Sequence, residues 1–61
     1  MSELQRILVK ITESKQKGEN RLYLTWGIAY ETLIELTNMG YLVLWIYKNS
    51  GIYTIVGWKN D

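Results

Sequence analysis

The hydrophobic positions of this chain follow a helical period at its start. In residues 2–17 the apolar side chains recur every three or four positions, at Leu4, Ile7, Leu8 and Ile11. This spacing places them on one face of a helix. Ser2 and Gln5 have the separation of a capping box, and Gly18 is a typical helix terminator. The pattern therefore predicts an amphipathic helix over residues 2–17.

A second interpretation of the same segment stays open. Ile7, Val9 and Ile11 also alternate along the chain, as the side chains of a strand do, and Ile and Val favour strands. Residues 6–13 would then form a strand that pairs with residues 21–25, and the fold would be ββαββ.

The middle of the chain predicts a short strand followed by a second helix. Residues 21–24, Arg-Leu-Tyr-Leu, are typical of a short strand. Thr25 is a suitable N-cap for a helix over residues 26–39, which Gly40 would end. Alternatively, Asn20 caps a longer helix that includes residues 21–24. That longer helix would have an apolar stripe at Leu22, Trp26, Ala29, Leu33 and Leu36.

Residues 41–58 predict a β-hairpin, and the other elements are expected to pack around it. β-Branched and aromatic residues fill both residues 41–47 and residues 52–58, and such residues favour strands. Between the two arms, Lys48-Asn49-Ser50-Gly51 fits a type I turn. In this turn Gly51 would adopt the left-handed conformation that a following bulge requires.

The two faces of this hairpin differ, and neither is polar. Leu42, Leu44 and Ile46 alternate with Tyr41, Val43, Trp45 and Tyr47. A hairpin with one solvated face should alternate apolar and polar residues, so both faces need cover. We expect the second helix to lie across the aliphatic face. The aromatic face is left for self-association or for a partner, with the predicted binding residues Tyr41, Trp45, Tyr47 and Tyr53.

Size and composition indicate how such a chain is stabilised. A chain of 61 residues forms one small α+β domain, residues 1–61. A domain of this size buries only about 60% of its unfolded surface. The sequence contains no Cys and no His, which excludes a disulfide framework, a zinc finger and a His-based metal site. Oligomerisation is the stabilising device that remains, and we therefore predict a homodimer.

The same absences argue against catalysis. The chain has no thiol nucleophile and no imidazole base. Glu31 and Glu35 share one face of the predicted second helix, but carboxylates at this spacing more often serve a solvated surface. We therefore predict no enzyme activity, no catalytic or metal-binding residues, no cofactor and no small-molecule substrate.

The sequence also predicts the setting of the protein. No apolar run approaches the ~20 residues that a membrane span requires. The first residues lack the basic segment of a secretory signal. We therefore expect an intracellular, cytoplasmic protein without a membrane partner.

The predicted order of elements resembles a winged-helix domain over residues 2–58. The shared features are a helix, a short strand, a second helix and a two-stranded wing, and the resemblance implies a DNA- or RNA-binding regulator. The sequence departs from this family in one place. Only one clear helix lies between Thr25 and Asn38, where winged helices have a helix-turn-helix pair, and that helix contains no Lys or Arg.

Four basic residues are candidates for contacts with a nucleic acid. The net charge is only +1, but Arg6, Lys10 and Lys17 share a helical face opposite the apolar stripe, and Arg21 follows. These four cations could contact phosphates. The leading prediction is nevertheless a homodimeric regulator or inhibitor that binds another macromolecule through the aromatic hairpin face. A protein is favoured over a nucleic acid as its partner.

Overall fold

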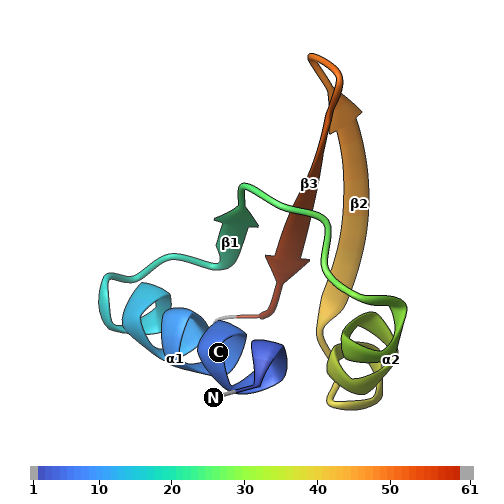
Figure 1. Ribbon diagram of the computed structural model, residues 1–61. Helices are drawn as coiled ribbons and strands as arrows, with labels where there is room; N and C mark the ends of the chain where they lie inside the picture. Colours follow the sequence, from blue (N-terminus) through green and yellow to red (C-terminus); the bar gives the residue numbers. More distant parts are fainter. Residues whose placement is uncertain (1, 60–61) are drawn as a thin grey trace.

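Two helices cover one face of a three-stranded antiparallel sheet (Figure 1). The computed structural model describes residues 2–59, in the order α1 (Glu3–Gln16), β1 (Arg21–Leu24), α2 (Tyr30–Asn38), β2 (Leu42–Lys48) and β3 (Gly51–Gly57). This order confirms the predicted α+β fold of helix, short strand, helix and β-hairpin. The ββαββ alternative is wrong, because residues 6–13 lie inside α1, and so is the longer helix from Asn20.

The start of α1 shows why this segment forms a helix rather than a strand. The Ser2 hydroxyl accepts a hydrogen bond from the Gln5 N–H (3.2 Å), and the Gln5 side chain accepts one from the Ser2 N–H (3.4 Å). This capping box satisfies backbone donors that a new helix leaves open. Ile7 and Ile11 are buried, whereas Val9, which a strand would place on their face, is 48% exposed.

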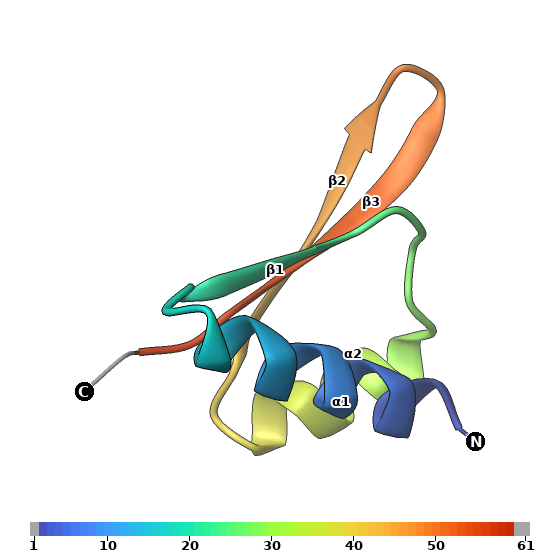
Figure 2. The same cartoon turned by 90° about the vertical axis from the view of Figure 1, so that its left-hand side faces the viewer.

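The central strand of the sheet is β3, because both β1 and β2 pair with it in the order β1-β3-β2. Figure 2 shows β1 alongside β3, although α2 and β2 separate them in the sequence. The Trp58 N–H donates to the Asn20 carbonyl (3.1 Å) and extends this ladder by one pair. The long-range pairing of β1 therefore completes a sheet from a hairpin that alone would be marginal in water.

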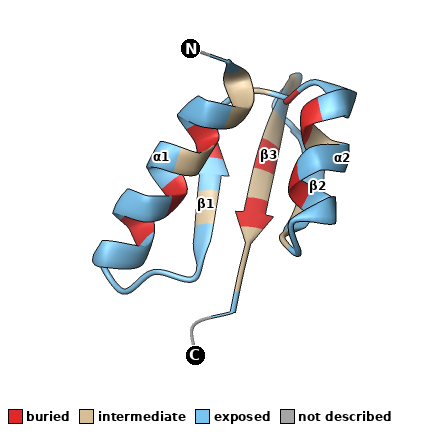
Figure 3. Ribbon diagram, turned by 90° about the horizontal axis from the view of Figure 1, so that it is seen from below, coloured by how far each residue is buried: buried red, intermediate tan, exposed pale blue. Residues whose placement is uncertain are grey.

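The pairing register assigns every strand residue to one of two faces. The inner face, which the helices cover, carries Leu22, Leu24, Val43, Trp45, Tyr47, Ile52, Thr54 and Val56. The apolar residues of the outer face are Tyr23, Leu42, Leu44, Ile46, Tyr53 and Ile55. Figure 3 shows the buried residues on the two helices and on β3. The buried core consists of Ile7, Ile11, Leu24, Ile28, Leu36 and Val56.

The choice of covered face corrects the prediction from sequence. The helices cover the face of Val43 and Trp45, not the aliphatic face of β2. Leu42 and Leu44 on the aliphatic side are 67% and 50% exposed. The reason lies in β3, because Thr54 and Val56 are fully buried and pair with Trp45 and Val43. Leu22 and Leu24, the two leucines of β1, belong to the same face as Thr54 and Val56.

The segment before α2 is also not the predicted helix. The helix begins at Tyr30 rather than at residue 26, and Ala29 occupies its N-cap position without a side-chain hydrogen bond. The proposed N-cap, Thr25, lies outside the helix. The Thr54 hydroxyl donates to the Trp26 carbonyl (2.8 Å) and accepts from the Ile28 N–H (3.1 Å). A side chain from β3 thus replaces the hydrogen bonds that a helical turn would have made.

The hairpin turn differs from the predicted type I turn. Lys48 pairs directly with Gly51, which leaves a two-residue loop of Asn49 and Ser50. Both loop residues have positive φ angles, 51° and 64°, as in a type I′ turn. The twist of a type I′ turn matches the right-handed twist of its strands, so no bulge after the loop is needed.

We predict that Thr54→Val lowers the free energy of unfolding by about 2–3 kcal/mol, since each buried backbone group left without a partner costs about 1–3 kcal/mol. Valine has a similar shape but leaves the Trp26 carbonyl and the Ile28 N–H without their hydrogen-bond partner. Urea denaturation followed by circular dichroism measures the change. Thr54→Ser is the control, because it keeps the hydroxyl and loses one methyl group. A larger loss for serine than for valine would contradict the role of the hydroxyl.

We predict that Ser50→Gly raises the free energy of unfolding by about 0.5–1 kcal/mol, because the left-handed conformation is strained for residues with a Cβ atom. Thermal unfolding compares the variant with the parent protein. Ser50→Ala retains the Cβ atom and should give no gain. A gain of equal size from alanine would show that the turn conformation is not the cause.

Candidate protein-interaction surface

The four aromatic residues predicted to bind a partner do not form one surface. Tyr41 is half-buried at the base of the sheet, where its ring meets Trp58 edge-on with centroids 6.4 Å apart. Trp45 and Tyr47 lie on the inner face, and Tyr53 lies half-buried on the outer face. Their role in binding stays a prediction, but they occupy three separate places in the fold.

Along its whole length, β2 is an edge strand of the sheet. The Trp58 N–H donates its hydrogen bond toward β1. Backbone N–H and C=O groups alternate in direction along a strand, so those of the even-numbered residues of β3 point to β1 and those of the odd-numbered residues point to β2. By the same alternation, the backbone N–H and C=O groups of Val43, Trp45 and Tyr47 point away from β3. No other strand in residues 2–59 pairs with this edge.

Exposed apolar side chains gather on the same strand. Eleven large apolar residues are exposed within residues 2–59, and five of them belong to β2: Leu42, Leu44, Trp45, Ile46 and Tyr47. A sixth, Tyr30, lies with its ring centroid 6.4 Å from that of Trp45.

Edge strands usually carry proline, a bulge or several charges that prevent pairing with another chain. In β2 the register is regular, and its only charged residue is Lys48 at the end of the strand. The β2 edge therefore lacks these three protective features.

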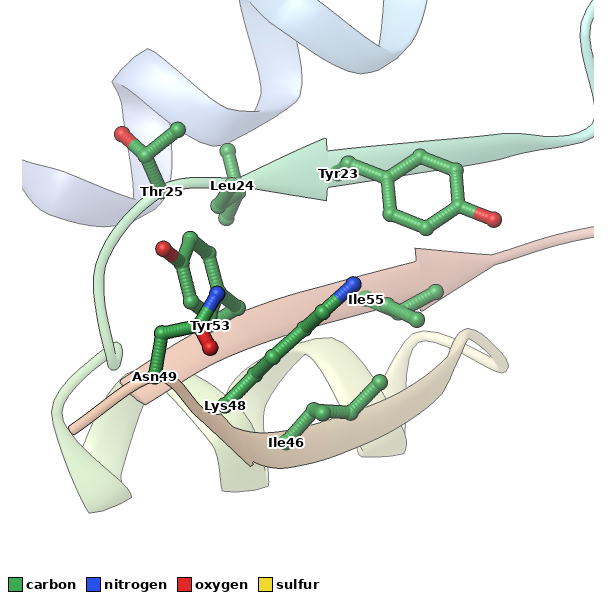
Figure 4. A pocket seen from close by; sticks show the side chains of 8 residues that line it. All are labelled: Tyr23, Leu24, Thr25, Ile46, Lys48, Asn49, Tyr53 and Ile55. Atoms are coloured by element: carbon green, nitrogen blue, oxygen red, sulfur yellow. The ribbon is translucent and has the colours of Figure 1, made fainter. Parts of the chain in front are cut away.

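The outer face is a second exposed apolar surface. Tyr23 of β1 is 64% exposed there, and Leu42 and Leu44 of β2 are exposed on the same face across the central strand β3. A hollow of about 490 Å³ lies between Tyr23, Ile46 and Tyr53, and Figure 4 shows the Lys48 side chain extending across β3 toward Ile55. A second hollow, of about 520 Å³, lies at the base of the sheet beside Arg21, Leu42 and Lys59. Both hollows open on the outer face.

Sequence patterns alone do not identify this surface. They place Leu42 and Leu44 beneath the second helix, and Tyr23 belongs to a strand of only four residues. The one available signal is that neither face of the hairpin is polar. The choice between the faces depends on the pairing of β1 with β3, which is a contact between distant segments.

The four cations predicted to contact nucleic acid are divided between two sides of the protein. Arg6 and Lys10 are exposed on α1, and Lys17 is at the C-cap of this helix. Arg21 pairs with Gly57 in the sheet, and its side chain belongs to the outer face, opposite the helices. The fold does not bring the four together.

Glu3 is a polar residue whose role the sequence did not reveal. Its carboxylate accepts hydrogen bonds from the Trp26 indole N–H and the Ala29 backbone N–H, both at 3.0 Å. Burial raises the pKa of this carboxyl, but hydrogen bonds from Ala29, Thr32 and Trp26 outweigh burial and bring the pKa below its usual value of 4.5. These contacts hold the segment before α2 against the first turn of α1.

The polar chemistry of the described residues offers little else. No group of three or more His, Cys, Asp or Glu in residues 2–59 is arranged to hold a metal ion. The predicted carboxylate pair, Glu31 and Glu35, is exposed on α2. The apolar β2 edge and the outer face are therefore the surfaces with a definite chemical character.

Comparison with protein-family models, with curated proteins and with solved structures finds no match to this chain. Within residues 2–59, neither helix has the length and apolar character needed to cross a lipid bilayer.

We predict that Glu3→Gln lowers the free energy of unfolding by about 1 kcal/mol near neutral pH, because it removes the charged acceptor of two hydrogen bonds. The folded-state pKa of Glu3 lies below 4.5, so its stabilisation is present above pH 4.5 and is lost as the pH falls through the folded-state value. Urea denaturation of both proteins at pH 7 and near pH 3 measures the difference, which should shrink at the lower pH. A difference that stays constant would rule out the charged carboxylate as its source.

Proposed function

We propose that this protein is a non-enzymatic interaction module, a small intracellular regulator or inhibitor that dimerises by pairing β2 of one copy with β2 of another. The observation that carries the proposal is the unprotected β2 edge, seven residues long and apolar up to Lys48. Edges of this kind recruit further strands through backbone hydrogen bonds. A shared sheet would also supply stability to a chain that has no cysteine for disulfides.

An antiparallel pairing centred on Trp45 would use every open backbone group on the edge. In this register Trp45 faces its own counterpart, and Val43 of one copy faces Tyr47 of the other. Each of these residues would exchange its N–H and C=O groups, which gives about six inter-chain hydrogen bonds. The contact is two-fold symmetric, so it closes after two copies and does not propagate into a fibre.

The same arrangement would account for the exposure of Tyr47. In the structure α2 lies beside the base of β2, and the tip of the hairpin extends beyond it (Figure 1). An antiparallel pair sets the tip of one β2 next to the base of the other. Tyr47, which is 77% exposed on the inner face, would then lie beside Val43 and α2 of the second copy. An amphipathic tyrosine suits such a contact.

A DNA- or RNA-binding regulator is the second candidate, and the order of helix, strand, helix and hairpin favours it. A helix that enters the major groove normally brings basic and amide side chains to the phosphates and bases. Instead, α2 carries Glu31 and Glu35 and has no Lys or Arg. The protein-binding candidate therefore has more support from the described residues.

We predict that Tyr47→Pro weakens dimerisation by about tenfold to a hundredfold. The substitution removes one open-edge N–H from each copy, and each hydrogen bond contributes about 1 kcal/mol. The chain itself should stay folded, because this N–H is not used in pairing with β3 and edge strands tolerate proline. Size-exclusion chromatography with light scattering at several concentrations measures the mass against the 7.2 kDa chain.

Tyr23→Pro is the matched control for this experiment. Tyr23 lies on the other edge strand, β1, and its N–H also points away from β3 by the alternation of the ladder. Its replacement should leave the dimer intact. A parent protein that is monomeric at all concentrations would refute the proposed dimer, and equal effects of the two proline variants would refute its β2 interface.

A further inference from the structure

We propose that the outer face binds an acidic amphipathic helix of a partner protein. This inference rests on the proposed function, since it names the chemistry of the macromolecule that the module binds. The outer face would remain open in the dimer, because pairing along the β2 edge extends the sheet within its own plane. The dimer would present two such faces side by side.

Charge identifies the kind of partner. Lys48 lies beside the hollow near the hairpin tip, and Arg21 and Lys59 lie beside the hollow at the base. No Asp or Glu of the described residues lines either hollow. Of the other described carboxylates, Glu3, Glu13, Glu31 and Glu35 belong to the two helices, which cover the opposite face, and Glu19 lies in the connection between α1 and β1. The outer face thus combines apolar side chains with three cations, Lys48, Arg21 and Lys59.

The dimensions of the face fit one helix. From Leu42 to Ile46 the strand covers about 13 Å at ~3.3 Å per residue. About nine residues of an α-helix span this length, and the helix diameter of about 10 Å equals the width of three strands. An apolar stripe on such a helix would cover Leu42, Leu44 and Ile46, and acidic side chains beside the stripe would meet the cations.

The surface fits two other classes of anionic partner less well. Single-stranded nucleic acid needs several exposed rings for stacking, but only Tyr23 is an exposed aromatic residue of this face, since Tyr53 is half-buried. Peripheral binding to an anionic bilayer typically uses an amphipathic helix with basic residues on its polar side, whereas Leu42, Leu44 and Ile46 belong to a strand.

The test uses an 18-residue peptide with leucines in a helical stripe, glutamates beside the stripe and a fluorescent label. The matched peptide has lysine in place of each glutamate. Fluorescence anisotropy with the full-length protein should show the acidic peptide binding at least tenfold more tightly than the basic one. Its affinity should fall as the salt concentration rises, because surface ion pairs are screened. Equal affinity for the two peptides, or binding of neither, would overturn the proposal.

Two pairs of variants locate the site. Lys48→Glu should lower the affinity for the acidic peptide about tenfold. Lys10→Glu on α1 makes the same change in net charge and should have little effect on this affinity. Leu44→Ser should also weaken binding, whereas Val9→Ser on α1 should not, although the two side chains are 50% and 48% exposed. An equal loss of affinity for the acidic peptide in the two α1 variants would overturn the assignment to the outer face.

The remaining arms separate this inference from its alternatives and from the dimer. Oligothymidine and vesicles that contain phosphatidylserine should not displace the labelled acidic peptide. Displacement by either would overturn the proposed helix partner in favour of a nucleic acid or a lipid surface. The Tyr47→Pro variant should still bind the acidic peptide as a monomer. The proposed dimer and the proposed partner can therefore fail independently.

Discussion

The position of α2 depends on the buried hydroxyl of Thr54. Residues 25–29 belong to no helix and no strand, so their backbone groups need partners from elsewhere. Thr54 supplies two of them from the middle of β3, and the carboxylate of Glu3 binds the same segment from the side of α1. These side chains hold the connection between β1 and α2 on the inner face, and α2 consequently begins there.

Both helices lie on one side of the sheet, and no helix or strand within residues 2–59 covers the other side. The core is small, with six buried apolar residues in the described part of the chain. Large apolar side chains remain on the outer face and along β2. In a protein of this size such surfaces are candidates for binding, because contiguous exposed apolar patches on small soluble domains often serve an interface. The two proposals follow from this single arrangement of layers.

Contacts between near neighbours in the sequence were predictable, since they depend on the residues that make them. The capping box of Ser2 and Gln5 and the positive φ of Gly18 after α1 agree with the patterns that predict them. The stripe of Ile7 and Ile11 is buried as its period requires. The turn was only partly predictable: a loop between Lys48 and Gly51 is present, but the twist of the paired strands selects the type I′ form.

The sequence by itself determined the order of the elements, the ends of α1 and the apolar character of the hairpin, because periodicity and capping act over a few residues. Only the tertiary structure decided which face of the hairpin is covered. Leu44 and Trp45 are both large and apolar, so the local pattern does not select the face of either one for burial. The choice comes from the pairing of β1 with β3 and from the hydrogen bonds of Thr54. Those contacts join segments far apart in the chain. For the same reason the outer face, which combines Tyr23 and Arg21 of β1 with Leu42 of β2 across the central strand, exists only in the folded protein.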